Sequence, residues 1–227
     1  VNAIKGAASN RDRSNDMVVA QPVFYEGGLL AWTASIAHWN DVGGITPGSM
    51  PADATEIWQE GLRLPCVHLF DGGRKVEAVF DIIALNSRLP EFVTGDLWAQ
   101  ISAGRRAAQP ILDMAKVYGE DAIKDAIATA FEEGEARALQ GLATLPQGRF
   151  PIAVEQDEGD IWQALIEITP KRFTVDLTEA PEQRKGPFNT SHDGARIACQ
   201  LLFKVLTDPT LFANAGSFRP LEVLTRK

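Results

Sequence analysis

Hydrophobic and polar positions alternate along two neighbouring runs near the start of the chain, residues 16–25 and 29–39. Both runs are rich in β-branched and aromatic residues, and the segment Glu26-Gly27-Gly28 separates them. A period of two is typical of strands, and a glycine-bearing link of three residues is typical of a hairpin. The pattern therefore predicts an antiparallel β-hairpin over residues 16–39.

The register of this hairpin predicts which side chains meet at its open end. If Tyr25 faces Leu29 across the loop, Asp16 lies directly opposite His38, and cross-strand Cβ atoms are about 5 Å apart. A bulge at Gly28 would instead shift the register by one residue and separate the two side chains onto opposite faces.

Helical periodicity takes over in the middle of the chain. An apolar run over 79–85 predicts a first helix, and Asp96 is the expected N-cap of a long helix that ends at about Tyr118. A second long helix is expected over about 121–142. Because only a short link around Gly119 joins the two long helices, we expect them to pack as an antiparallel pair.

A period of two returns after residue 146 and predicts a three-stranded meander, followed by a helix near 195–206 and a strand at 220–223. The expected fold is α+β: antiparallel hairpins and a meander packed with the long helix pair. The expected segments are an irregular leader (1–15), the hairpin and a glycine-rich loop (16–73), a helical segment (74–145), and the meander, helix and final strand (146–227). Residues 16–227 are expected to form one unit.

Composition narrows the class of protein. A net charge of −8 and a pI near 5, without a Lys/Arg cluster, argue against a nucleic-acid partner. Cys66 and Cys199 cannot build a disulfide framework or a four-cysteine metal site, which fits a reducing compartment. The first residues lack the pattern of a signal peptide, and the sequence has no run of about 18 apolar residues. We expect a soluble, cytoplasmic protein without a membrane partner.

Asp16 and His38 are the leading candidates for chemistry. Brought together at the end of a hairpin, next to the glycine-rich segment 40–44, a carboxylate and an imidazole could share a divalent metal ion or a proton. An Asp–His hydrogen bond that merely closes a strand end is the simpler alternative.

Other candidates have ordinary structural explanations. His68 lies in an apolar strand pattern, and Ser191 or Asp193 is expected to cap a helix beside His192. Glu56 and Glu60 would face the same way on a helical turn, where they could approach a cation or remain solvated. The glycines of 43–50 lack the spacing and the Lys-Ser or Lys-Thr pair of a phosphate loop, so this chain is not expected to bind nucleotides.

Several motifs, taken in order along the chain, closely resemble the hydantoinase B/oxoprolinase family over about residues 16–223. They are the segments 16–19, 37–44, 47–51, 56–65, 95–100, 186–189 and 214–220. The chain is less than half the usual length of this family, which indicates a fragment of a larger subunit.

The resemblance implies a function. Members form the metal-bearing subunit or half of ATP-dependent enzymes that open cyclic amides, such as N-methylhydantoinases, 5-oxoprolinases and caprolactamases. A hydantoinase A-like partner binds ATP and phosphorylates the substrate, while the subunit similar to this chain handles the activated intermediate. Acetone and acetophenone carboxylases are related, so ATP-dependent carboxylation of a ketone is the alternative reaction.

The resemblance also implies a site. Asp16 matches the aspartate of the family's His-x-x-Asp metal motif, and His38 matches its later histidine, with zinc or manganese as the expected class of ion. Asp41 is expected to orient His38 or a ligand. Arg13 replaces the first histidine of the motif, and arginine stays protonated and cannot ligate a metal. A noncatalytic structural subunit is therefore a further hypothesis.

Overall fold

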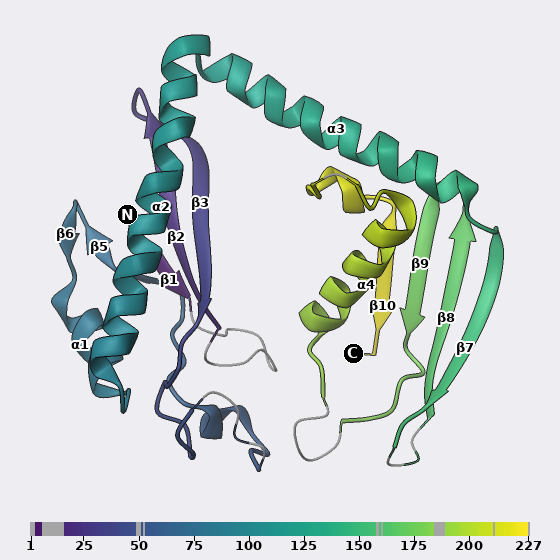
Figure 1. Ribbon diagram of the computed structural model, residues 1–227, viewed down its shortest axis with the longest axis horizontal. Helices are drawn as coiled ribbons and strands as arrows, with labels where there is room; N and C mark the ends of the chain where they lie inside the picture. Colours follow the sequence, from purple (N-terminus) through teal and green to yellow (C-terminus); the bar gives the residue numbers. More distant parts are fainter. Residues whose placement is uncertain are drawn as a thin grey trace. The chain divides into compact units, whose positions relative to one another are not determined.

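The computed structural model in Figure 1 describes residues 3–5, 16–48, 51, 53–157, 159, 161–183, 189–210 and 212–226. The chain divides into two compact units, residues 1–124 with 185–189 and residues 125–184 with 190–227. The single unit expected for 16–227 is therefore corrected to two, each with its own hydrophobic core. Among the described residues, no helix combines the length and hydropathy that a membrane crossing requires.

The first unit is built on a four-stranded antiparallel sheet in the order β3-β2-β1-β4. The strands are β1 (Ala3–Lys5), β2 (Asp16–Tyr25), β3 (Gly28–His38) and β4 (Val67–His68). The first of these strands corrects the expected irregular leader. Three residues are too few to show a period, and β1 exists because both β2 and β4 pair with it.

The hairpin has the predicted partners at its open end but a different turn. Its loop has two residues, Glu26 and Gly27, with φ values of 48° and 85°. Positive φ at both positions belongs to a type I′ turn, which matches the twist of the strands. Tyr25 therefore pairs with Gly28, and a register shift next to Val23 restores the predicted alignment beyond it. Asp16 and His38 are confirmed as direct cross-strand partners.

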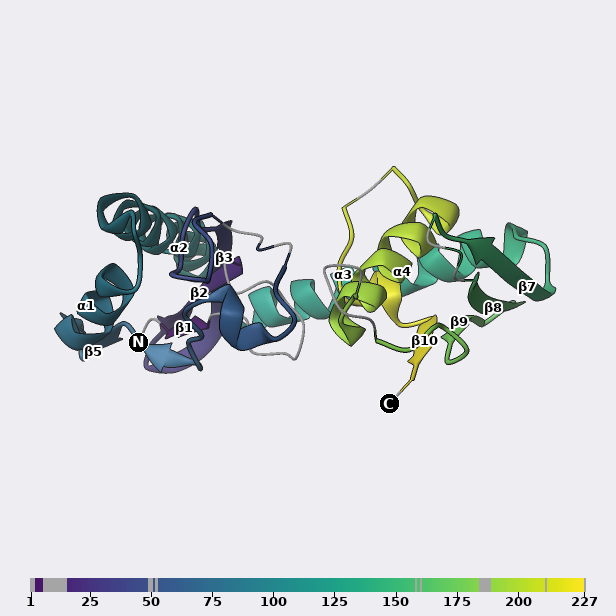
Figure 2. The same ribbon diagram turned by 90° about the horizontal axis from the view of Figure 1, so that it is seen from below.

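Two helices, α1 (Glu77–Leu85) and α2 (Pro90–Tyr118), complete the first unit. Helix α2 packs along β2 and β3, as Figure 2 shows from below. It begins at Pro90 and not after Asp96, because proline is well tolerated in the first helical turn. Shorter elements of this unit are the 3-10 helix η1 (Ile57–Glu60) and the strands β5 (Phe70–Asp71) and β6 (Arg74–Lys75).

The core of the first unit lies between α2, α1 and the hairpin. Its most deeply buried side chains are Met17, Trp39, Leu69, Ile83, Val93, Leu97 and Ile101. Met17 directly follows Asp16, and Trp39 directly follows His38. The two candidate residues therefore stand at the edge of a rigid core and are anchored by their neighbours.

The second unit has a four-stranded sheet in the order β10-β9-β8-β7. The strands β7 (Gly148–Glu155), β8 (Ile161–Thr169) and β9 (Arg172–Leu177) form the predicted antiparallel meander, and the final strand β10 (Leu221–Thr225) pairs with β9 in parallel. The remaining elements are α3 (Glu120–Thr144), α4 (His192–Thr207) and the 3-10 helix η2 (Gly216–Phe218).

The expected antiparallel pairing of the two long helices is corrected. The buried positions of α2 belong to the core of the first unit, whereas Ala138 and Leu142 of α3 belong to the core of the second. Helix α3 instead lies close to the chain around η2 and the end of α4. A Cβ atom at Gly141 or Gly216 would collide with the backbone of Thr207 or Phe131, so glycine permits this approach.

Candidate metal and proton site

The end of the hairpin brings Asp16 and His38 into direct contact. The Nδ1 atom of His38 lies 2.8 Å from Oδ1 of Asp16, at the distance of a hydrogen bond. Their side chains are 39% (His38) and 40% (Asp16) exposed, so solvent and small ligands reach the pair. The contact follows from the register, which places the two residues opposite one another on the same face.

This geometry allows two kinds of chemistry. If Nδ1–H of His38 donates to Asp16, the lone pair on Nε2 is free to bind a metal ion or to accept a proton. If His38 is deprotonated at Nδ1, a metal ion can take the place of the shared proton and bind both side chains.

The donor set fits a zinc- or manganese-class ion in part. A carboxylate and an imidazole are suitable ligands. Within the described ranges, however, no group of three His, Cys, Asp or Glu side chains could hold an ion. Arg13, the position of the expected departure from the family motif, lies outside the described residues. A complete coordination shell therefore needs donors in addition to Asp16 and His38.

Gln100 of α2 ties together the backbone around the pair. Its Nε2 donates to the carbonyl oxygens of Met17 (2.8 Å) and Ser35 (3.0 Å), and its Oε1 accepts from Nε1 of Trp39 (2.9 Å). The side chain is only 4% exposed, so these bonds are made away from water. Both amide hydrogens and the carbonyl oxygen are used.

These bonds fix the residues next to both candidates. Met17 follows Asp16 on β2, and Trp39 follows His38 at the end of β3. One side chain of α2 therefore connects the two strand ends that carry the pair. Gln100 was not predicted from the sequence, although one signal was available: it is a polar residue at a position where α2 is otherwise apolar.

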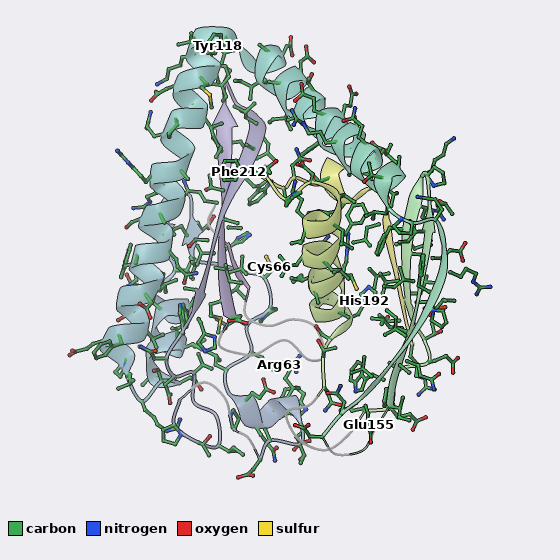
Figure 3. All side chains as sticks on the ribbon, turned by 45° about the vertical axis from the view of Figure 1, so that its right-hand side comes forward. Arg63, Cys66, Tyr118, Glu155, His192 and Phe212 are labelled. Carbon is green, nitrogen blue, oxygen red and sulfur yellow. The ribbon has the colours of Figure 1, made fainter. Side chains whose placement is uncertain are left out.

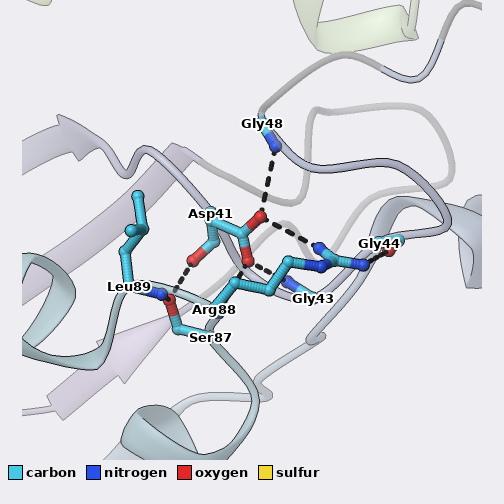
Figure 4. A network of polar contacts seen from close by, with 7 residues as sticks. All are labelled: Asp41, Gly43, Gly44, Gly48, Ser87, Arg88 and Leu89. Atoms are coloured by element: carbon cyan, nitrogen blue, oxygen red, sulfur yellow. Dashed lines mark hydrogen bonds and ion pairs between the residues drawn. The ribbon is translucent and has the colours of Figure 1, made fainter.

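Asp41 organises the glycine-rich loop that follows His38 (Figure 4). It is 2% exposed, and its carboxylate accepts hydrogen bonds from the amides of Gly43 (3.0 Å), Gly48 (3.1 Å) and Arg88 (3.1 Å). The guanidinium group of Arg88 adds an ion pair at 2.9 Å. The backbone oxygen of Asp41 accepts from Ser87 at 2.8 Å.

The expected role of Asp41 is therefore corrected. Its hydrogen bonds go to the loop and to Arg88, and none joins it to His38. Arg88 also donates to the carbonyl oxygen of Gly44 at 2.6 Å, so the arginine holds the loop at a second point. Asp41 acts as the centre of a structural network, two residues beyond the end of β3.

The environment of Asp41 lowers its pKa. Burial alone would raise the pKa, but the hydrogen bonds from the Arg88 amide, the Gly48 amide, the Arg88 guanidinium and the Gly43 amide outweigh it. The carboxylate is therefore the form that the folded protein prefers.

This shift predicts acid sensitivity. Because the folded pKa of Asp41 lies below its usual value of 3.8, its charged form stabilises the protein above that pH. The contribution is lost as the pH falls from 3.8 through the lower folded pKa. We expect the free energy of unfolding of Asp41→Asn to depend less steeply on pH than wild type in this range. Urea denaturation at a series of pH values measures the difference, and identical slopes would contradict the assignment.

A second segment is fastened to the same loop. Gly43 and Gly61 form an isolated antiparallel bridge, and the amide of Leu62 donates to the carbonyl oxygen of Val42 at 2.7 Å. Gly61 has a φ of 115°, and a Cβ atom there would collide with Val42, so the pairing depends on glycine. The next residue but one, Arg63, places its guanidinium group 4.8 Å from the centre of the Trp58 ring. Figure 3 marks Arg63.

The other sequence candidates take structural roles. The amide of Glu56 donates to Oε1 of Gln59 at 3.3 Å ahead of the 3-10 helix η1. A 3-10 helix has three residues per turn, so Glu56 and Glu60 do not share a face as expected for an α-helix. Ser191 is confirmed as the N-cap of α4, because its Oγ accepts from the amide of Gly194 at 2.9 Å. His68 is exposed on β4.

Comparisons with known proteins agree with this architecture. A D-/L-hydantoinase component of the hydantoinase B type from Pseudomonas sp. (strain NS671) is 31% identical over 224 residues, which are 91% of this chain and 38% of that protein. The acetophenone carboxylase delta subunit of Aromatoleum aromaticum is 29% identical over 86% of this chain and 29% of its own length. The chain therefore spans about a third of the length of these relatives.

Solved structures support the same relationship. The ATP-dependent caprolactamase of Pseudomonas jessenii matches 98% of this chain and 39% of its own chain, with a TM-score of 0.89 and 26% identity. An acetone carboxylase matches 97% of this chain and 32% of its own, with a TM-score of 0.81 and 16% identity, which shows a shared fold.

A family model also covers almost the whole sequence. The match begins at residue 7 and continues to residue 227, so it starts upstream of the motifs that began at Asp16. The described sheets, helices and hairpin all fall within it, apart from β1. The chain belongs to the hydantoinase B/oxoprolinase family.

Proposed function

We propose that this chain is part of the metal-bearing subunit of an ATP-dependent enzyme that hydrolyses cyclic amides. The observation that carries the proposal is the contact between Asp16 and His38, 2.8 Å apart and partly exposed, in a member of the hydantoinase B/oxoprolinase family. The names of the relatives support an amide hydrolase: a D-/L-hydantoinase and an ATP-dependent caprolactamase. A hydantoinase A-like partner would bind ATP and activate the substrate.

Asp16 and His38 would hold the ion, with additional ligands from outside the described residues. When bound, a divalent ion supplies Lewis-acid polarisation of a carbonyl or phosphoryl oxygen, or lowers the pKa of a bound water. His38 would keep its ring orientation through the strand pairing at Asp16. Gln100 would hold both strand ends in place from the core side.

The first test is metal content. We expect the intact protein to hold about one divalent ion per chain, and His38→Ala and Asp16→Asn to lose it without unfolding, because both side chains are partly exposed. Elemental mass spectrometry measures the ion, and circular dichroism monitors the fold. His68→Ala is the matched control, since His68 is an exposed histidine of the same sheet. An unchanged metal content in His38→Ala would reject the ligand assignment. No ion in the wild type would favour the noncatalytic alternative.

ATP-dependent carboxylation of a ketone is the second candidate reaction. The observation that favours it is the 29% identity to an acetophenone carboxylase delta subunit over 86% of this chain. The reconstituted assembly with its ATP-binding partner would distinguish the reactions. Phosphate release from ATP that depends on a cyclic amide supports hydrolysis, whereas release that depends on a ketone and bicarbonate supports carboxylation.

A further inference from the structure

A small polar cavity lies in the second unit, between α4, η2 and β10. Its volume is about 220 Å³, and its lining consists of His192, Arg196, Gln200, Phe218, Leu221 and Val223. This volume is below the range of roughly 300–1,000 Å³ typical of pockets for drug-sized ligands. It has room for a small ligand or for one functional group of a larger one.

The polar side of the cavity comes from one face of α4. His192, Arg196 and Gln200 are spaced four residues apart, so they follow one another along the same face of the helix. All three can donate hydrogen bonds, and no carboxylate lines the cavity. Arg196 makes no ion pair among the described residues, so its guanidinium group is available to a ligand.

Strand β10 forms the opposite side and orients the histidine. Nδ1 of His192, which Figure 3 marks, lies 2.8 Å from the hydroxyl oxygen of Thr225. When the hydroxyl donates to Nδ1, the ring hydrogen lies on Nε2, and His192 becomes a donor. Glu222 alternates to the other face of β10, where it accepts from Arg172 and Thr174, so its charge is engaged there.

We propose that His192, Arg196 and Gln200 bind a phosphate group. Three donor residues, one of them a permanently charged arginine fork, suit a group that presents several acceptor oxygens, and the absence of a carboxylate from the lining favours an anion. This site belongs to the second unit, whereas Asp16 and His38 belong to the first. It is therefore independent of the proposed metal site.

Calorimetric titration of the intact protein with inorganic phosphate tests the proposal. We expect saturable binding that Arg196→Gln weakens roughly tenfold or more, because a charge-assisted hydrogen bond is lost. Thr225→Val should weaken binding by a smaller factor, since it removes only the partner that orients His192. Arg149→Gln is the control, because Arg149 is an exposed arginine of the same unit that does not line the cavity.

Three further arms decide between sources. Methyl phosphate that binds as well as phosphate would identify a phosphate ester as an acceptable ligand, and phosphate alone would identify the free ion; either supports the site. Acetate that binds as tightly would overturn the choice of a phosphate group. Phosphate binding that survives in Arg196→Gln but is lost in His38→Ala would place the anion at the metal site and overturn the proposal, as would no binding at all. Unchanged metal content in Arg196→Gln keeps this test separate from the proposed function.

Discussion

Replacing Asp41 with alanine is expected to lower the free energy of unfolding by about 3 kcal/mol or more. The carboxylate is 2% exposed and accepts from three backbone amides and one guanidinium group. Its removal leaves the amides of Gly43, Gly48 and Arg88 without an acceptor in a place that water reaches poorly. Urea denaturation of the wild type and the variant at neutral pH measures the loss.

A matched control separates this network from ordinary surface charge. Asp113 of α2 is also an ion-paired aspartate, bonded to Lys116 and Gln109, but its side chain is 58% exposed. We expect Asp113→Ala to leave the stability nearly unchanged, as exposed ion pairs contribute little. Equal losses in the two variants would show that the buried network around Asp41 has no special stabilising role.

The sequence was sufficient to predict the position of the candidate pair because the relevant interactions are local and periodic. Alternation within residues 16–38 sets the strand faces, and a hairpin leaves few choices of register. The predicted three-residue turn was wrong, yet the two-residue turn and the nearby register shift compensate, and Asp16 still faces His38. The pairing depends on the sum of these features and not on the turn alone.

Long-range contacts could not be predicted in the same way. Arg88 lies 47 residues from Asp41 in sequence, and no spacing rule connects them. An amphipathic stripe shows that a helix is buried on one side but not which partner covers it, so the expected pairing of α2 with α3 was wrong. The role of Asp41 was mistaken for the same reason, because closeness in sequence to His38 suggested a contact that the fold does not make.

The other large effect is expected at Gln100. Leucine at this position would fit the apolar core in size but would leave Nε1 of Trp39 and the carbonyl oxygens of Met17 and Ser35 without their bonds to Gln100. We expect Gln100→Leu to lower the free energy of unfolding by about 3 kcal/mol, since each unsatisfied buried group costs about 1–3 kcal/mol. Thermal and urea denaturation measure the change.

A site-specific measurement can separate global destabilisation from loss of positioning. If Gln100 holds the strand ends that carry Asp16 and His38, Gln100→Leu should weaken metal binding even at temperatures where the variant is fully folded. Chelator competition under those conditions measures the affinity. Thr33→Val is the matched variant, because Thr33 is another buried polar residue of β3 that bonds to α2, through the carbonyl oxygen of Gly104 at 3.1 Å, but lies away from the open end of the hairpin. Equal metal affinity in both variants would assign Gln100 to stability alone, whereas a selective loss in Gln100→Leu would show that the core of the first unit sets the geometry of the pair.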